Sequence, residues 1–288
     1  MLRGTNMLLR IGAAAAFTLG LSASAPVLTV EETARSIQPG EVVVLTVNST
    51  AALTGLRVRA FDRALESFRV QDRVWRVLVG IDLDVKPGPH VVAIEGDTSE
   101  GAERTSHTLR VAPKTFPTRR LTVAERYVNP PPAVLRRIEE EAARLTRIWS
   151  GSARTRLWTT FVEPVPQAAN SAFGSRSVFN GQPRSPHGGA DFPSPAGTPV
   201  KAPSAGRIVL ADNLYYTGNT VVIDHGLGLV SLFAHLSKID VSQDATVAAG
   251  NVIGLVGATG RVTGPHLHWT VRADGARVDP LSVLAVLR

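Results

Sequence analysis

The chain has 288 residues, a net charge of +7 and no cysteine. This length accommodates one large domain or two modest ones, and with 44% hydrophobic residues the chain can bury a core, which excludes disorder throughout. Without cysteine, any zinc site must use nitrogen and oxygen ligands. The basic balance suits an anionic partner such as a membrane surface or an acidic wall polymer, although a lineage bias toward Arg would give the same balance. Because no basic run is interleaved with aromatic residues, nucleic acid is not favoured.

The N-terminus has the features of a secretory signal. Basic residues precede an apolar stretch at residues 11–21, which is too short to span a bilayer comfortably, and Ala23-Ser24-Ala25 fits a cleavage site. We therefore predict a signal peptide over residues 1–25 and an exported protein of the periplasm, the cell envelope or the extracellular space. Pro26 directly follows the best cleavage point. An uncleaved N-terminal anchor, with membrane association, is therefore the alternative.

Residues 26–113 are predicted to form a β-sandwich-like domain. Short apolar or alternating segments are separated by turn residues such as Pro39-Gly40, at the spacing of sandwich strands. No chemistry is predicted for this domain, and its two lone histidines, His90 and His107, are assigned surface or structural roles. The predicted strands cover residues 42–47, 56–61, 75–80, 90–94 and 108–111.

Residues 114–170 are predicted to form a linker that contains one helix at about 132–149. The run Asn129-Pro130-Pro131-Pro132 stops whatever precedes it. Apolar residues then recur at spacings of three and four, with charged residues on the other face, so we expect the helix to pack on a neighbouring domain. Binding of a partner is the alternative. The apolar stripe consists of Leu135, Ile138, Ala142, Leu145 and Trp149.

The last part of the chain is again β-like, which makes the predicted fold class mainly β. A hairpin is expected at Gly226-Leu227-Gly228, and no helix is expected before the final few residues. The predicted antiparallel strands cover residues 206–211, 220–225, 229–235, 252–257 and 266–271.

Four of the seven histidines lie in three short motifs of this region: His187-Gly188-Gly189-Ala190-Asp191, His235 at a strand end, and His266-Leu267-His268. Residues two apart on a strand share a face, so His266 and His268 would face together, with Leu267 and Trp269 turned to the core. The same alternation would place His235 on the face of Phe233. Each motif alone also fits an ordinary loop, core-edge or surface role, and His225 is assigned a structural role at its turn. Several imidazoles and a carboxylate together indicate a metal site.

The motifs occur together and in order, and with their flanks they resemble the catalytic domain of the M23 (LytM/lysostaphin-type) zinc metallopeptidases. The resemblance covers residues 171 to about 285 and implies an antiparallel β-sheet peptidase domain over residues 171–288. It also implies that Zn²⁺ is the cofactor, that His187, Asp191 and His268 are its ligands, and that His235 and His266 are the catalytic residues. Other matching segments are residues 173–176, 196–200, 222–226, 233–237, 257–260 and 279–281.

Three protein ligands would leave a fourth zinc position for water, as in catalytic zinc sites. No Glu accompanies the ligands, so His235 and His266 are the candidates for general base and for stabilising developing charge, in a division that the sequence leaves open. The resemblance implies a zinc metalloendopeptidase that hydrolyses stem or cross-link peptides of peptidoglycan. Gly-Gly and D-Ala-to-diamino-acid links both remain open, and the oligomeric state is not indicated.

Two other functions compete with this interpretation. A catalytically dead family member could regulate another wall hydrolase, but such domains typically lose ligands, and all five key residues are present here. A wall-binding or adhesion protein would bind through the N-terminal sandwich, in which case residues 27–113 alone should bind peptidoglycan. The sandwich could instead gate the catalytic groove, in which case removal of residues 27–150 should raise activity.

Overall fold

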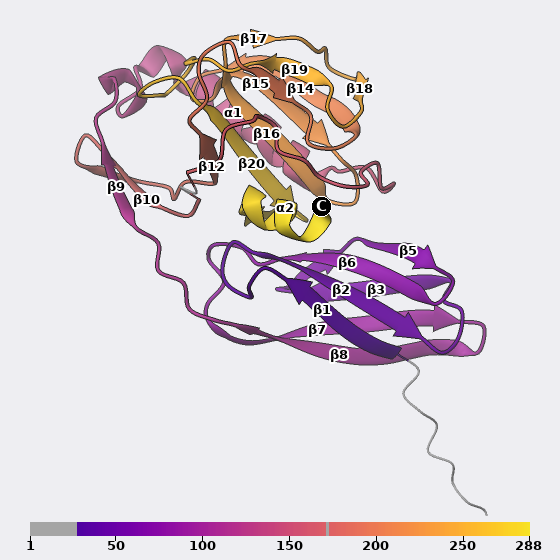
Figure 1. Ribbon diagram of the computed structural model, residues 1–288. Helices are drawn as coiled ribbons and strands as arrows, with labels where there is room; N and C mark the ends of the chain where they lie inside the picture. Colours follow the sequence, from indigo (N-terminus) through magenta and orange to yellow (C-terminus); the bar gives the residue numbers. More distant parts are fainter. Residues whose placement is uncertain (1–27, 171–172) are drawn as a thin grey trace, which may run out of the picture.

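The computed structural model describes residues 28–170 and 173–288, so the predicted signal peptide at residues 1–25 lies outside the described residues. The described chain forms two β-rich lobes, one above the other, joined by a segment that climbs along one side (Figure 1). The mainly β fold class is therefore confirmed. Within the described ranges, no helix is both long and apolar enough to cross a membrane.

The lower lobe is a sandwich of two antiparallel four-stranded sheets. The strands are β1 (Leu28–Ala34), β2 (Val42–Ser49), β3 (Gly55–Ala60), β4 (Arg63–Leu65), β5 (Ser67–Gln71), β6 (Val74–Gly80), β7 (Gly88–Thr98) and β8 (Gly101–Val111). One sheet has the order β1-β2-β6-β5 and the other has the order β4-β3-β7-β8. The five strands predicted here from the sequence are all present.

Strand β2 is apolar on both faces because each face meets a different core. Val43 and Leu45 are fully buried between the two sheets of the sandwich. Val42 and Val44 instead pack into the hydrophobic cluster of the upper lobe. Since successive residues of a strand point to opposite faces, burial on both sides requires a continuous apolar run rather than alternation.

The upper lobe is built around a seven-stranded antiparallel sheet. Its strands and those of two small sheets beside it are β10 (Arg176–Phe179), β11 (Gln182–Arg184), β12 (Gly189–Phe192), β13 (Pro199–Lys201), β14 (Gly206–Leu214), β15 (Gly218–Asp224), β16 (Leu229–Leu236), β17 (Lys238–Ile239), β18 (Thr246–Val247), β19 (Val252–Leu255), β20 (Leu267–Ala273) and β21 (Ala276–Val278). The main sheet has the order β12-β20-β16-β15-β14-β18, with β21 paired to β20, and β13-β19-β17 form a second sheet. The five predicted strands are again present, with ends shifted by a few residues.

The segment predicted as a linker contributes structure to the upper lobe. Its strand β9 (Thr118–Leu121) pairs in parallel with β10 and completes the small sheet β11-β10-β9. A short 3₁₀ turn at Glu125–Tyr127 and helix α1 (Pro132–Ser150) follow. The helix was predicted from the sequence but the strand was not, because β9 is short and half of its residues are arginine.

Helix α1 packs on the outer face of the main sheet. Leu145, Ile148 and Trp149 contact the hydrophobic cluster on that face. Two members of the predicted stripe, Leu135 and Ala142, are exposed. The face of the helix that contacts the sheet therefore differs in part from the predicted stripe. It includes Ile148, in the last turn of the helix, which was not part of the stripe.

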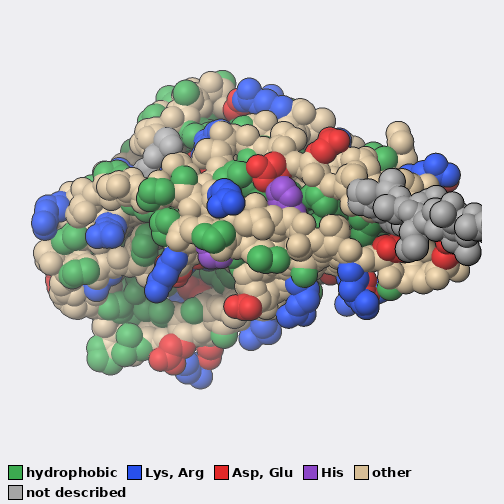
Figure 2. Space-filling model, turned by 90° about the horizontal axis from the view of Figure 1, so that it is seen from below, with side chains coloured by type: hydrophobic (Ala, Val, Ile, Leu, Met, Phe, Trp, Pro, Cys, Tyr) green, Lys and Arg blue, Asp and Glu red, His purple; other side chains and the backbone are tan. Residues whose placement is uncertain are grey.

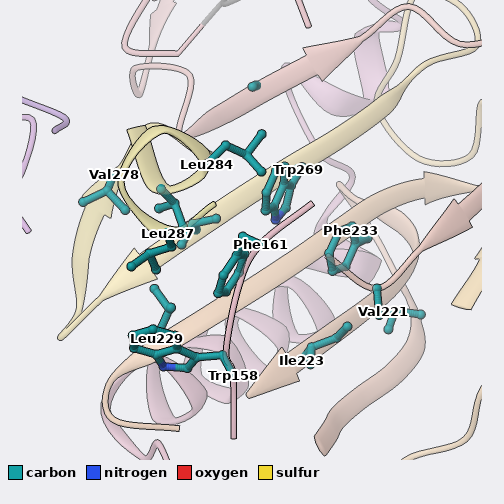
Figure 3. Packing of buried hydrophobic residues seen from close by; sticks show 14 of the residues in the cluster. Trp158, Phe161, Val221, Ile223, Leu229, Phe233, Trp269, Val278, Leu284 and Leu287 are labelled. Carbon is teal, nitrogen blue, oxygen red and sulfur yellow. The ribbon is translucent and has the colours of Figure 1, made fainter. Parts of the chain in front are cut away.

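The other face of the main sheet carries the larger core. Leu267 and Trp269 of β20 are fully buried in it, as predicted from alternation, and the Trp269 ring lies parallel to that of Phe233, with centroids 6.0 Å apart. Figure 3 shows these two rings gathered with Phe161 and with Leu284 of helix α2 (Pro280–Leu287). This face of the sheet is therefore closed by apolar packing, which leaves the opposite face for the polar site.

The two lobes are joined by polar contacts around a shared core. The Ser282 hydroxyl accepts a hydrogen bond from the backbone N–H of Val42, and the Arg277 guanidinium donates to both Asp82 and Asp84. Arg35, directly after β1, donates to the Asp279 carboxylate of the upper lobe. Figure 2 views the molecule from the sandwich side, where basic, acidic and hydrophobic side chains are intermixed. The positive charge of the chain is therefore not gathered into one patch on that side.

Candidate metal centre

The register between β12 and β20 creates the centre of the site. Asp191 lies directly opposite His268, and directly opposed residues of an antiparallel pair project from the same face. Gly189 makes the close strand approach possible, since a Cβ atom there would lie 2.3 Å from the Trp269 carbonyl oxygen. His187 lies two residues before the start of β12, and its backbone N–H donates to the Ser175 carbonyl. His187 and Asp191, four residues apart, therefore meet the sequence-distant His268 at one face of the sheet.

The potential ligand atoms of these three side chains converge on one point. His187 Nε2 lies 3.0 Å from His268 Nδ1 and 3.1 Å from Asp191 Oδ1, and the third distance, from His268 Nδ1 to Asp191 Oδ1, is 3.0 Å. Tetrahedral zinc with bonds of about 2.0–2.1 Å separates its ligand atoms by about 3.3 Å. Two imidazoles and one carboxylate at this spacing fit a small divalent cation.

The protonation of the cluster also fits metal binding. Burial acts to raise the pKa of Asp191, but hydrogen bonds from His187 and His268 outweigh it and hold the pKa well below its usual range. Burial lowers the pKa of His268. The cluster therefore favours a carboxylate and a neutral imidazole at neutral pH, which are the forms that bind metals.

Neighbouring groups fix the orientation of the ligands. His268 Nε2 lies 2.9 Å from the Thr270 hydroxyl. When His268 Nδ1 binds a metal ion, Nε2 carries the proton and can donate it to this hydroxyl. The second carboxylate oxygen of Asp191 lies 3.4 Å from the Arg119 guanidinium of β9. Both contacts are of the kind that hold metal ligands in place and tune their basicity.

His235 reaches the site through a β-bulge. The register between β15 and β16 shifts beside it, its φ is +66°, and its backbone N–H donates to the Thr217 carbonyl. The expected alternation, which placed His235 on the core face with Phe233, is wrong for this reason. A bulge re-aims a side chain, and the His235 ring lies 5.0 Å from that of His266 and 5.9 Å from that of His268.

His235 and His266 are both anchored through Nδ1. His235 Nδ1 lies 2.9 Å from the Thr259 carbonyl oxygen, and His266 Nδ1 lies 2.9 Å from the Gly264 carbonyl oxygen. Since a carbonyl only accepts hydrogen bonds, each Nδ1 carries the proton and each Nε2 presents a lone pair. Burial, helped by the neighbouring His268 and His266, lowers the pKa of His235 to about 3. His266 lies just before β20 and bridges to Gly257, with its Nε2 3.8 Å from Asp191 Oδ1.

The other histidines have structural surroundings. His225 is fully buried, with its ring nitrogens 2.8 Å from the Ala205 carbonyl and 3.0 Å from the Ser231 hydroxyl, and burial lowers its pKa to about 4. His90 contacts the Lys86 carbonyl and His107 contacts Glu32, both in the sandwich. None of the three lines the cavity at the metal centre.

The cluster opens into a cavity of about 160 Å³, which is lined by the four site histidines, Asp191, Arg119 and Arg261, among others. A site role for Arg119, Arg261 or Thr270 was not predicted from the sequence. Thr270 could have been found from alternation, since it shares a face with His268 two residues earlier. No local signal marked Arg119, because it reaches the site only through the pairing of β9 with β10.

Comparisons with known proteins give the family. Residues 185–280 match Peptidase family M23. A solved structure from Pseudomonas aeruginosa, described as a peptidase M23, is 36% identical with a TM-score of 0.67, and the match covers 86% of this chain and 95% of that one. The fold and the His/Asp/His cluster are those of an M23-type β-sheet peptidase domain, and the chain belongs to peptidase family M23.

Two relatives whose names state an enzymatic activity each match about a third of this chain. The peptidoglycan DD-endopeptidase ShyA of Vibrio cholerae is 47% identical over 96 residues, which is 33% of this chain and 22% of that protein. The DD-carboxypeptidase/endopeptidase Mpg of Neisseria meningitidis is 46% identical over 97 residues, which is 34% of this chain and 22% of that protein. The match thus spans about a fifth of the length of these relatives.

Proposed function

We propose that this protein is an exported zinc metalloendopeptidase that hydrolyses peptide bonds in the stem or cross-link peptides of peptidoglycan. The observation that carries the proposal is the convergence of three ligand atoms within 3.0–3.1 Å of one another, beside two further histidines in one cavity. The names of the relatives from Vibrio cholerae and Neisseria meningitidis support peptidoglycan as the substrate class.

His187, Asp191 and His268 would hold the zinc ion. When bound, zinc lowers the pKa of a water molecule toward neutrality and polarises the scissile carbonyl. The three ligands must keep a fixed geometry to bind the ion. The Thr270 hydroxyl restrains His268, and the Arg119 guanidinium restrains Asp191.

His235 and His266 would move the proton. Each ring is held through Nδ1 by a backbone carbonyl, so each Nε2 can accept a proton from the attacking water. The histidine that accepts it becomes a cation, which stabilises the negative charge that develops on the carbonyl oxygen and can then protonate the leaving amine. In both histidines Nδ1 carries the proton, and both line the cavity. We therefore assign proton transfer and charge stabilisation to the pair without dividing them.

We place the protein in the periplasm or cell envelope, or outside the cell. A peptidoglycan substrate lies outside the cytoplasmic membrane, and the basic composition suits an anionic wall. The predicted signal peptide, residues 1–25, is the segment that would direct export. Membrane association would follow only if that segment is not cleaved.

Digestion of purified peptidoglycan tests the proposal. The zinc-loaded protein should release peptide fragments whose masses identify the cleaved bond, and a chelator should abolish the release until zinc is restored. Intact peptidoglycan after incubation with fully zinc-loaded protein would refute the proposed activity. In that case, binding of the protein to the wall would favour a regulatory or adhesion role.

Variants separate the ligands from the catalytic pair. His187→Ala, Asp191→Ala and His268→Ala should each lose zinc. His235→Ala and His266→Ala should keep zinc but lose activity. His90→Ala is a matched control, because this histidine contacts a backbone carbonyl of the sandwich and should change neither property. Full activity in either His235→Ala or His266→Ala would remove that residue from the mechanism.

A further inference from the structure

Arg261 occupies a fixed position beside the metal centre. It lies in the segment between β19 and β20, and its backbone N–H donates to the Tyr216 carbonyl. Its guanidinium carbon lies 4.8 Å from the ring centre of Phe179 and 4.7 Å from that of Tyr216. Contact with two aromatic faces restrains a guanidinium while leaving the N–H groups at its edge available.

Arg261 faces the same space as the metal ligands. It lines the cavity of about 160 Å³ at the cluster and also a cavity of about 520 Å³ beside it, and both cavities include His187 and His268 in their walls. A peptide bound with its scissile bond at the cluster would therefore bring its neighbouring groups close to this guanidinium.

The described part of the chain gives Arg261 no acidic partner. In residues 28–170 and 173–288, no carboxylate forms an ion pair with it and no acceptor for its guanidinium is found. This differs from Arg277 and Arg35, each of which binds two carboxylates. Burial lowers the pKa of Arg261, while Tyr216 acts to raise it and the neighbouring Arg184 acts to lower it further.

The walls of both cavities are biased toward positive charge. Among the described residues that line them, Asp191 is the one carboxylate and is already committed to the metal cluster, whereas Arg119, Arg184 and Arg261 are all cationic. A bound divalent cation would increase this bias. Such a site favours an anionic ligand, and a guanidinium with free N–H groups matches a carboxylate with two parallel hydrogen bonds.

We propose that Arg261 binds a free carboxylate of the substrate next to the scissile bond, and that it thereby makes the enzyme selective for anionic cross-links. The inference rests on the proposed function. In a D-Ala–diaminopimelate link, the carbon that bears the scissile nitrogen also carries a free carboxylate. A Gly-Gly link has no such group. Arg261 therefore favours the first of the two bonds that the sequence left open.

The test compares two purified cross-linked muropeptides that differ at one group. This group is the diaminopimelate carboxylate on the carbon that bears the scissile nitrogen, which is free in one substrate and amidated in the other. The zinc-loaded wild-type protein should cleave the free-carboxylate form with a kcat/KM about 10–100-fold higher, as expected for a charge-assisted hydrogen bond. Arg261→Gln should lose this preference, because its kcat/KM should fall for the free-carboxylate form and stay unchanged for the amidated form. Arg207→Gln removes the same charge from an exposed pair with Asp244, away from both cavities, and should keep the preference.

Zinc content and melting temperature of Arg261→Gln show whether the variant keeps its fold and its metal centre. Equal cleavage of the two muropeptides by the wild-type protein would overturn the inference while leaving the peptidase function intact. A loss of equal size on both substrates in Arg261→Gln would also overturn it, because a structural role predicts that result. If the zinc-loaded wild-type protein cleaves neither substrate, the proposed function fails and the inference fails with it.

Discussion

Thr270 tests whether the orientation of a ligand controls metal affinity. Thr270→Val keeps the shape of the side chain but removes the oxygen that lies 2.9 Å from His268 Nε2. The Thr270 residue is 8% exposed, so water cannot readily replace the lost acceptor. In the zinc-loaded protein, where Nδ1 binds the metal, the buried Nε2–H of His268 would then be unsatisfied, which costs about 1–3 kcal/mol. Loss of a partner behind a metal-binding histidine lowers metal affinity about 10–100-fold, a range that agrees with this cost.

Zinc affinity can be measured by competition with a chromophoric chelator, alongside the melting temperatures of the zinc-free and zinc-loaded proteins. Thr270→Val should bind zinc about 10–100-fold more weakly. Thr270→Ser is the matched control, because it keeps the hydroxyl and should stay within a few-fold of the wild-type affinity. Wild-type affinity in a folded Thr270→Val protein would refute the assigned role of this hydroxyl, and with it the argument that His268 Nε2 carries the proton.

Three further predictions concern stability. Burial raises the pKa of Asp274, beside Glu66 and Arg63, to about 7. The stabilisation from the protonated Asp274 should therefore be full below about pH 4 and lost as the pH rises through 7. The free energy of unfolding should fall by up to about 1.4 kcal/mol per pH unit in this range. Urea denaturation of Asp274→Asn should therefore show a flatter dependence than wild type between pH 4 and 7, and parallel curves would contradict this pKa. Arg277→Ala removes the partner of Asp82 between the lobes and should lower the free energy of unfolding in urea by about 1–3 kcal/mol. Arg207→Ala removes an exposed pair with Asp244 and should lower it by less than about 1 kcal/mol. Similar losses in the two variants would argue against the contribution of the interface pair. Gly218→Ala would place a Cβ 2.3 Å from the Thr259 hydroxyl at a φ of +63° and should lower stability by at least about 2 kcal/mol, whereas Gly264→Ala meets no atom within 4 Å; equal melting temperatures for the two variants would contradict this packing.

The strands could be predicted from the sequence because their patterns report burial directly. The alternation in Leu56, Val58 and Ala60 reports one buried face, and the continuous run in β2 reports two. Short strands such as β9 and β11 were not predicted, because three or four residues give too little periodicity. Their existence depends on pairing with other segments, as between β9 and β10.

The candidate site was predicted as a set of residues but not as a geometry. The convergence of the His187, Asp191 and His268 ligand atoms follows from strand register, which no local pattern specifies. For His235, the local pattern gave the wrong face, because the bulge is produced by the pairing of β15 with β16 and by the hydrogen bond to Thr217.

The sequence by itself determined the mainly β fold, the family resemblance and the residue types available for a cysteine-free metal site. These depend on composition, periodicity and short motifs, all of which are local. The tertiary structure decided which atoms meet: the tautomers of His235 and His266, the approach of Arg119 to Asp191, and the seating of Arg261 against Phe179 and Tyr216. Each of these contacts joins segments brought together by the fold or depends on a local backbone turn, so its energy depends on the packing of the folded chain rather than on residue type.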